Sequence, residues 1–337
     1  MFIGGGPAQK NPFYLALYIS FFPQLVAGPI VRYVTIVEEI KSRKTSWKLF
    51  STGMMRFVVG FNKKMILSNL LAEVVDCAFS ISPLSFGLAW LGSICYTLQI
   101  FYDFSGYSDM AIGMGQIFGF HFLENFDYPY ISKTITEFWR RWHISLGSWF
   151  RDYVYFPLGG SRVPSKIRLV FNLSIVWLTT GIWHGASWHF IVWGLLYGVM
   201  IIIEKLLLIP QKVQEKKSWG FYQIITLLAI NFGWVLFRAE SLAVAGNYLG
   251  TMLGINCKIY FDNNFIFYLR DYAIILAVSL LFATPIMNVI ENKLLSQKAL
   301  YVKTHKNALS FAHVFLFTVS VSFLAVNAHI PFIYFNF

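Results

Sequence analysis

The sequence predicts an all-α polytopic membrane protein with a single domain. Of its 337 residues, 57% are hydrophobic and only 13% are charged, and the mean hydropathy is +0.58. Apolar runs recur along the whole length, and no Pro/Ser-rich linker or block of like charge separates them. This composition is typical of a protein embedded in a lipid bilayer rather than of a soluble domain. We therefore treat residues 1–337 as one membrane domain.

Eight apolar runs are long enough to cross a bilayer. The hydrocarbon core is about 30 Å thick and a helix rises about 1.5 Å per residue, so a span needs about 20 mostly apolar residues. The second run is the weakest because charged residues interrupt it, and the third is long enough to be tilted or broken. The predicted spans are residues 13–30, 52–78, 84–118, 168–184, 186–204, 219–237, 271–290 and 308–330.

The positions of the basic residues give these spans an orientation. Twenty of the 27 Lys and Arg residues fall in every second loop, and none lies between Lys64 and Lys133. Short cytoplasmic loops are enriched in Lys and Arg, so the alternation puts residue 1 outside and the segment 121–168 in the cytoplasm. The net charge of +11 is thus explained by orientation in the inner or plasma membrane. Membrane lipid, and not nucleic acid, is the expected partner.

The cytoplasmic segment holds a stretch that is both charged and aromatic. Projected at about 100° per residue, TITEFWRRWHISLGSWFRDYVYF has tryptophans on one side and charges on the other. This pattern predicts one amphipathic helix that lies in the interface or re-enters the protein. His143 falls at the border of the apolar stripe, where a side chain can face a buried aqueous cavity. The apolar sector holds Trp139, Trp142, Leu146, Trp149, Phe150 and Tyr153.

Ionisable side chains inside apolar spans need a reason, because each costs on the order of 3 kcal/mol or more near the midplane. His184 is the deepest by counting, since a helix from Arg168 would carry it about 24 Å into the membrane. Gly181 and Gly185 beside it allow tight backbone turns and leave room for a substrate. The candidates are Asp103, Asp109, His184, His189, His313 and His329.

At several of these positions a structural role is an alternative to a catalytic one. Asp103 and Asp109 can pair with Tyr, Trp or basic residues between helices, and His189 can pack one turn beyond His184. The three cysteines have no metal or redox spacing, and neither H-x3-H nor G-x-S-x-G occurs, so no metal site and no serine hydrolase is predicted. A proton-coupled transporter stays open because buried His and Asp suit proton relays, although the sequence lacks an internal repeat.

Five motifs carry a resemblance to a known family. They are FFPQLVAGPIVRY at 21–33, YDFSGYSDMAIG at 102–113, EFWRRWHISLGSWFRDYVYFPLGG, WLTTGIWHGASWHFIVWGLLYG, and NFGWVLFRAES at 231–241. In this order they resemble the membrane-bound O-acyltransferase (MBOAT) family, in the branch of the bacterial alginate O-acetyltransferase membrane subunit. The resemblance covers nearly the whole chain and implies an MBOAT-like helical bundle.

The resemblance implies that an acetyl group moves across the membrane to extracytoplasmic polysaccharide. The implied donor is a cytoplasmic thioester, acetyl-CoA or an acyl-carrier thioester, and the implied recipient includes a periplasmic or surface acetyltransferase partner. The family's essential histidine, in its W-H-G motif, corresponds to His184. Its second histidine, in R-W-H-I-S, corresponds to His143.

The chemistry of the residues agrees with these roles. Transfer from a thioester to a hydroxyl needs a base that works near neutral pH, and histidine supplies one. We predict His184 as the general base and His143 for donor binding or orientation of the thioester carbonyl, with no metal or bound cofactor. Arginines near the donor mouth can hold phosphates, although arginines beside a span also serve headgroup contacts. The predicted donor-binding residues are Arg140, Arg141, Arg151, Asp103 and Trp183.

One departure from the family pattern keeps alternatives open. Members of this branch usually carry further spans before the first motif, so the sequence is expected to be a truncated reading frame or a shortened homologue. D-alanyl transfer to teichoic acid is the alternative within the family. An inactive membrane scaffold that recruits a secreted acetyltransferase is the alternative from another class.

Overall fold

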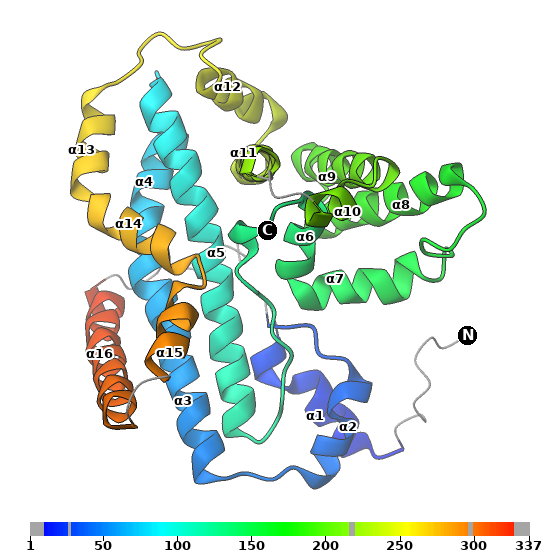
Figure 1. The fold of residues 1–337 in the computed structure, drawn as a ribbon, viewed down its shortest axis with the longest axis vertical. Coiled ribbons are helices and arrows are strands. Elements are labelled where there is room, and N and C mark those ends of the chain that lie inside the picture. The colour runs from blue at the N-terminus through cyan, green and yellow to red at the C-terminus, as the bar shows by residue number, and fades with distance from the viewer. Residues whose placement is uncertain (1–9, 26–27, 216–219, 296–298, 327–337) are drawn as a thin grey trace.

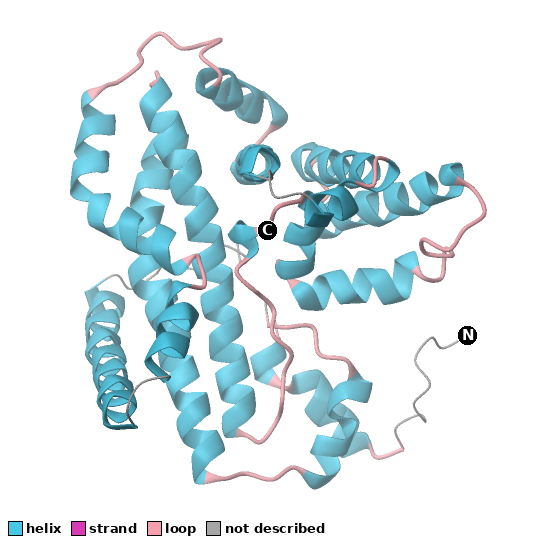
Figure 2. Cartoon of the chain, viewed as in Figure 1, coloured by secondary structure: helices cyan, strands magenta, loops and turns pink. Residues whose placement is uncertain are grey.

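The computed structural model describes the chain except residues 1–9, 26–27, 216–219, 296–298 and 327–337. Its regular elements in the described part are all helical (Figure 2), which confirms the all-α class. The elements are α1 (Pro12–Ser20), η1 (Phe22–Gln24), α2 (Tyr33–Ser42), α3 (Trp47–Asn62), η2 (Lys63–Ser68), α4 (Asn69–Ser80), α5 (Phe86–Ile117), η3 (Pro129–Ile131), α6 (Ile135–Arg141), α7 (Ile144–Phe150), η4 (Arg151–Tyr155), α8 (Lys166–His184), α9 (Trp188–Leu206), α10 (Ile209–Glu215), α11 (Gly220–Arg238), α12 (Leu242–Met252), α13 (Asn263–Asp271), α14 (Ala273–Phe282), α15 (Ile286–Leu295) and α16 (Ala299–Val326).

Helices α3 and α4, joined by the π-helical turn η2, run along the 32-residue helix α5 (Figure 1). Glycines let the two backbones touch. A Cβ on Gly60 would lie 2.4 Å from the carbonyl oxygen of Gly106, and one on Gly113 would lie 2.5 Å from that of Gly53. The glycines of the third predicted span therefore serve close packing, and α5 is not broken there.

The three basic residues that interrupt the second predicted span face α5, whereas Glu73 accepts a hydrogen bond from the hydroxyl of Tyr272. Arg56 and Lys63 both pair with Asp109, at 2.9 and 2.6 Å, and Lys64 pairs with Asp103. Asp103 and Asp109 therefore pair with basic residues of neighbouring helices, which is the structural role predicted as an alternative to catalysis. Pairing and hydrogen bonding are what make charges tolerable between buried helices.

The predicted count of eight spans is not confirmed. Within the described residues, three helices are long and apolar enough to cross a membrane, namely Trp188–Leu206, Gly220–Arg238 and Ala308–Val326. A fourth candidate is the pair α13 and α14, which is bent by 59°. The span predicted at 13–30 is wrong as a single helix, because α1 has nine residues and rises only about 14 Å. The span predicted at 271–290 is likewise divided between α14 and α15.

The predicted amphipathic helix is also wrong as one continuous element. It is divided into α6 and α7 at His143, whose backbone is left-handed with φ 47°. Backbone and side-chain oxygens of Asn125, in the preceding loop, accept the N–H groups of Ile144 and Ser145 at 3.0 and 3.1 Å. The first turn of α7 is thus satisfied from outside, and a helix that ran on from α6 could not form these bonds.

An aromatic cluster joins α6 to the helices α8, α9 and α11. The Trp139 ring lies 5.0 Å from Trp177 and 4.9 Å from Tyr197, and the Trp142 ring lies 4.8 Å from Trp234. Figure 1 shows the pair α6 and α7 beside α8 and α9. The segment of α6 and α7 is therefore held by its tryptophans, as the apolar stripe predicted, and this packing forms one wall of a cavity.

Candidate active site

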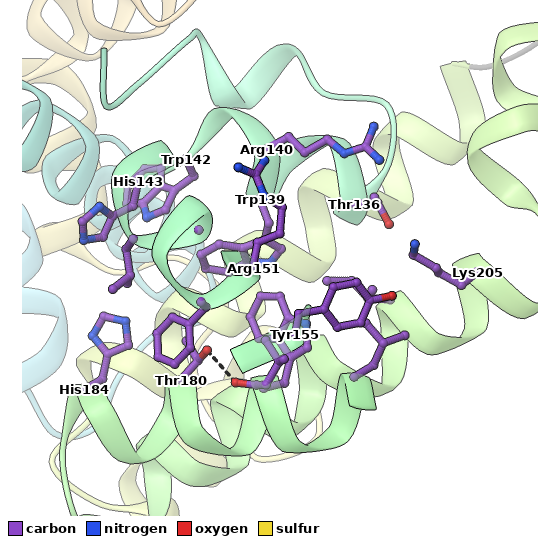
Figure 3. A pocket seen from close by; sticks show the side chains of 17 residues that line it. Thr136, Trp139, Arg140, Trp142, His143, Arg151, Tyr155, Thr180, His184 and Lys205 are labelled. Carbon is purple, nitrogen blue, oxygen red and sulfur yellow. Dashed lines mark hydrogen bonds between the residues drawn. The ribbon is translucent and has the colours of Figure 1, made fainter. Parts of the chain in front are cut away.

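A cavity of about 230 Å³ lies between the segment from α6 to η4 and helices α8 and α9. Figure 3 shows His143 and His184 at one end of it and Lys205 at the other. The cavity thus joins two histidines to a cationic end through an aromatic middle. The lining residues include Thr136, Trp139, Arg140, Trp142, His143, Leu146, Phe150, Arg151, Tyr155, Trp177, Thr180, His184, Ile201 and Lys205.

His184 is the last residue of α8, at the turn of a helical hairpin. Its ring packs edge-on against the rings of Trp193 and Phe237, at 5.0 and 5.2 Å. A Cβ on Gly185 would lie 2.6 Å from the Phe190 ring, so the turn that follows His184 needs glycine. The predicted tight turn is confirmed, and it holds the histidine buried against aromatic walls.

His143 enters the same end of the cavity from the break between α6 and α7. Its side chain is buried, and its Nδ1 lies 3.2 Å from the side-chain oxygen of Asn125. The Phe104 ring packs against it at 4.6 Å. The half-exposed Trp183 ring lies 4.8 Å from the His184 ring and 6.3 Å from the His143 ring. The fold therefore brings together two histidines that are about 40 residues apart.

The cavity lining carries positive charge. Lys205 lies at the end away from the histidines (Figure 3), Arg140 and Arg151 also line the cavity, and among the described lining residues there is no carboxylate. Arg151 donates to Asp152 at 2.8 Å, and Asp152 also pairs with Arg32 at 2.7 Å. The hydrogen bond from Arg151, together with the one from Arg32, holds the pKa of Asp152 below its ordinary value. Even with the Asp152 carboxylate ionised, the cations that line the cavity leave it with net positive charge, which suits an anionic ligand.

Three residues predicted for donor binding lie outside the cavity lining. Asp103 is buried in its pair with Lys64, and Arg141 donates to Asp127 and to Glu137. Trp183 touches both histidine rings from outside the lining. Their part in donor binding stays a prediction.

Two functional residues were not predicted from the sequence, namely Lys205, which lines the cavity, and its neighbour Glu204, which lies outside the lining. Glu204 is 1% exposed, and its carboxylate accepts the backbone N–H groups of Ile135 and Thr136 at 2.7 and 2.8 Å. The hydroxyl of Tyr222 also donates to it, at 3.1 Å. Glu204 thus ties the first turn of α6 to α9 and α11. An ionisable side chain at the end of a predicted apolar span was the signal that could have indicated it.

We expect Glu204→Ala to lower the free energy of unfolding by about 3 kcal/mol or more, because it leaves two buried N–H groups without their charged acceptor. Glu204→Gln should cost less, since one amide oxygen remains to accept. Thermal unfolding in detergent measures both effects. The control is Glu38→Ala, which removes a carboxylate that is exposed. Equal unfolding midpoints for Glu204→Ala and Glu38→Ala would contradict the assigned role.

Comparison with known proteins adds to this geometry. A family model described as "MBOAT, membrane-bound O-acyltransferase family" matches residues 9–247. The chain is 45% identical over 252 residues to a probable alginate O-acetylase AlgI of Pseudomonas putida, an alignment that covers 74% of this chain and 51% of that protein.

Two other relatives bear different names. Identity is 39% over 246 residues to a peptidoglycan O-acetyltransferase of Helicobacter pylori, covering 72% of this chain and 46% of that protein. It is 31% over 247 residues to a teichoic acid D-alanyltransferase of Bacillus subtilis, covering 68% and 61%. The chain spans about half the length of the first two relatives.

Proposed function

The chain belongs to the membrane-bound O-acyltransferase family, and from that premise we propose that it transfers an acetyl group from a thioester donor to a cell-envelope polysaccharide or to a partner protein. One observation carries the proposal. The same cavity is lined by His184 of the W-H-G motif and by three cationic side chains, with Lys205 at the end away from the histidine (Figure 3). This arrangement offers a base where the acyl group reacts and counter-charges where an anionic donor enters.

The cationic end supports a donor that carries phosphate. Both coenzyme A and the phosphopantetheine arm of a carrier protein are anionic, and Arg140, Arg151 and Lys205 offer charge-assisted hydrogen bonds to such groups. The thioester end of the donor would then lie toward the histidines, among the aromatic side chains in the middle of the cavity. Arg141, Asp103 and Trp183 would act on the donor only through the residues that line this path.

The reaction at the histidine end needs one base and no redox partner. His184 takes the proton of the acceptor hydroxyl as the hydroxyl oxygen attacks the thioester carbonyl carbon. The carbon–sulfur bond then breaks, and the leaving thiolate takes the proton from His184. The products are an acetyl ester and a free thiol, and the histidine is regenerated.

The level of identity to relatives supports acetyl transfer over D-alanyl transfer. Identity is 45% and 39% to the two relatives named for O-acetylation, and 31% to the one named for D-alanylation. The buried His184 in a cavity supports an enzyme over an inactive scaffold. The proposed setting is the inner or plasma membrane, with donor on the cytoplasmic side and a periplasmic or surface partner on the other.

Deletion of the gene and its restoration test this function. We expect O-acetyl groups on the surface polysaccharide, measured by NMR, to disappear on deletion and return with the wild-type gene. D-alanyl esters should stay constant in the same samples. O-acetyl groups that persist after deletion would overturn acetyl transfer, and D-alanyl esters that disappear instead would favour the alternative within the family.

A further inference from the structure

Asn125 precedes His143 by 18 positions and contacts the break between α6 and α7. Asn125 is 1% exposed and lies in the loop between α5 and α6. Its side-chain oxygen faces three groups, namely the backbone N–H of Ser145 at 3.1 Å, the Ser145 hydroxyl at 2.9 Å and Nδ1 of His143 at 3.2 Å. Its amide nitrogen donates to the hydroxyl of Ser108 on α5 at 3.1 Å.

These contacts decide which atoms carry hydrogen. A backbone N–H can only donate, so the Asn125 atom that faces Ser145 must be the oxygen and not the amide nitrogen. The same oxygen faces Nδ1 of His143, and an oxygen without a hydrogen can only accept. Nδ1 must therefore carry a hydrogen. The Ser145 hydroxyl agrees, because it already donates to Asn125 and can offer only a lone pair to Nδ1 at 3.5 Å.

We propose that Asn125 is a positioning residue that holds His143 as the Nδ1–H tautomer, so that Nε2 presents a lone pair to the cavity. A neutral imidazole has one donor nitrogen and one acceptor nitrogen, and the bond made by one determines the other. This tautomer makes His143 a hydrogen-bond acceptor for a substrate, an assignment that rests on the proposed function. Its ligand is then the acceptor hydroxyl or an amide N–H of a pantetheine arm.

This changes the role predicted for His143 from the sequence. Orientation of the thioester carbonyl needs a hydrogen-bond donor, and the nitrogen left for a ligand is an acceptor. The left-handed backbone of His143 fits the same function. A non-glycine residue there is strained, and such strain persists where surrounding contacts hold it in place. Asn125 supplies those contacts through the bonds to Ile144, Ser145 and the ring itself.

Neighbouring charged groups influence the pH at which His143 gains a proton, so they must be considered in any test of its pH dependence. His184 of α8 faces the same end of the cavity, and the acidic groups of α5 and its following loop are paired with basic residues. Arg140, Arg151 and Lys205 also line the cavity. The charged pairs that involve α5 and the loop after it are Asp103 with Lys64, Asp109 with Arg56 and Lys63, Glu124 with Arg56, and Asp127 with Arg141.

The histidine spectrum of the wild-type protein tests the tautomer directly. ¹⁵N NMR of histidine-labelled protein in detergent distinguishes a protonated ring nitrogen from one with a lone pair, and the signal lost in His143→Gln assigns the residue. We expect a hydrogen on Nδ1 and a lone pair on Nε2 at neutral pH. A hydrogen on Nε2 would overturn the proposal, whether Nδ1 is bare or also protonated. This readout needs no activity.

The variant N125D tests the consequence for the reaction. It keeps the acceptor oxygen but adds a charge that favours the imidazolium, so the pKa of His143 should rise. Because the reaction needs the lone pair, the acid limb of the pH–rate profile should move to higher pH by about one unit or more. The control S108A removes only the bond to the amide nitrogen and should leave the limb in place.

The outcomes are distinguishable from failure of the proposed function. If wild-type protein shows no His184-dependent acetyl transfer, the proposed function fails while the histidine spectrum still decides the tautomer. If transfer occurs and the acid limbs of N125D and wild type coincide, the positioning role is overturned. If N125D does not fold or has no activity at any pH, the wild-type spectrum alone decides.

Discussion

His184→Ala is expected to lower the rate of acetyl transfer by about 10²- to 10⁴-fold, which is the contribution of a well-placed general base. The loss should fall mainly on kcat, because the cationic end of the cavity that would bind the donor is untouched. His184→Gln is the sharper variant, since it fills the space against Trp193 and Phe237 but cannot take a proton. Donor-dependent acetylation by membranes that contain each variant measures the effect.

The control for this substitution lies in the same motif. His189 is buried with its ring 4.1 Å from that of Phe190, and it is not among the residues that line the cavity. His189→Gln should therefore retain most of the wild-type rate. A wild-type rate for His184→Gln, or an equal loss in both variants, would contradict the assignment of the base.

Lys64→Met is expected to cost about 3–5 kcal/mol of stability, because it leaves the carboxylate of Asp103 buried without its counter-ion. Lys64 and Asp103 are 5% and 1% exposed, and the Ser68 hydroxyl also donates to Asp103 at 3.3 Å. The double variant Lys64→Met with Asp103→Leu should recover most of the loss, since it removes both charges. A double-mutant cycle on thermal unfolding in detergent measures the coupling.

The same pair of variants examines the predicted role of Asp103 in donor binding. If Asp103 serves only to pair with Lys64, the double variant should bind donor with a KM close to that of wild type. A raised KM in a protein of restored stability would assign the aspartate to the donor path. Additive losses in the cycle would contradict a direct interaction between the two side chains.

Much of the candidate site could be predicted from the chain of residues. His184, His143, Arg140 and Arg151 were all named, and the structure brings them to one cavity. His184 was identified because an imidazole deep in an apolar run has a high cost, and that signal is local. Glu204 and Asn125 were not predicted because their importance lies in their partners, which are 18 to 69 residues away for Glu204 and 17 to 20 away for Asn125.

The helices, too, include some that local sequence predicts and a break that depends on distant contacts. The apolar runs at 186–204 and 219–237 predicted α9 and α11 closely, because length and hydropathy are properties of a contiguous segment. The break at His143 was not predicted. Periodicity favours a continuous helix there, and the loop that contains Asn125 competes for the N–H groups of α7. Hydrophobic periodicity depends only on residues that are near in the sequence, so it cannot indicate that Asn125 takes the N–H groups of α7.

Composition and local spacing are enough to predict the membrane character, the all-α class and the histidine at the hairpin turn. The nitrogen of His143 that carries hydrogen, the counter-ion of Asp103 and the anchor of α6 depend instead on contacts between distant segments. One cause accounts for all three. A buried polar group is satisfied by whichever partner the fold brings near it, and in a helical bundle that partner comes from another helix or loop.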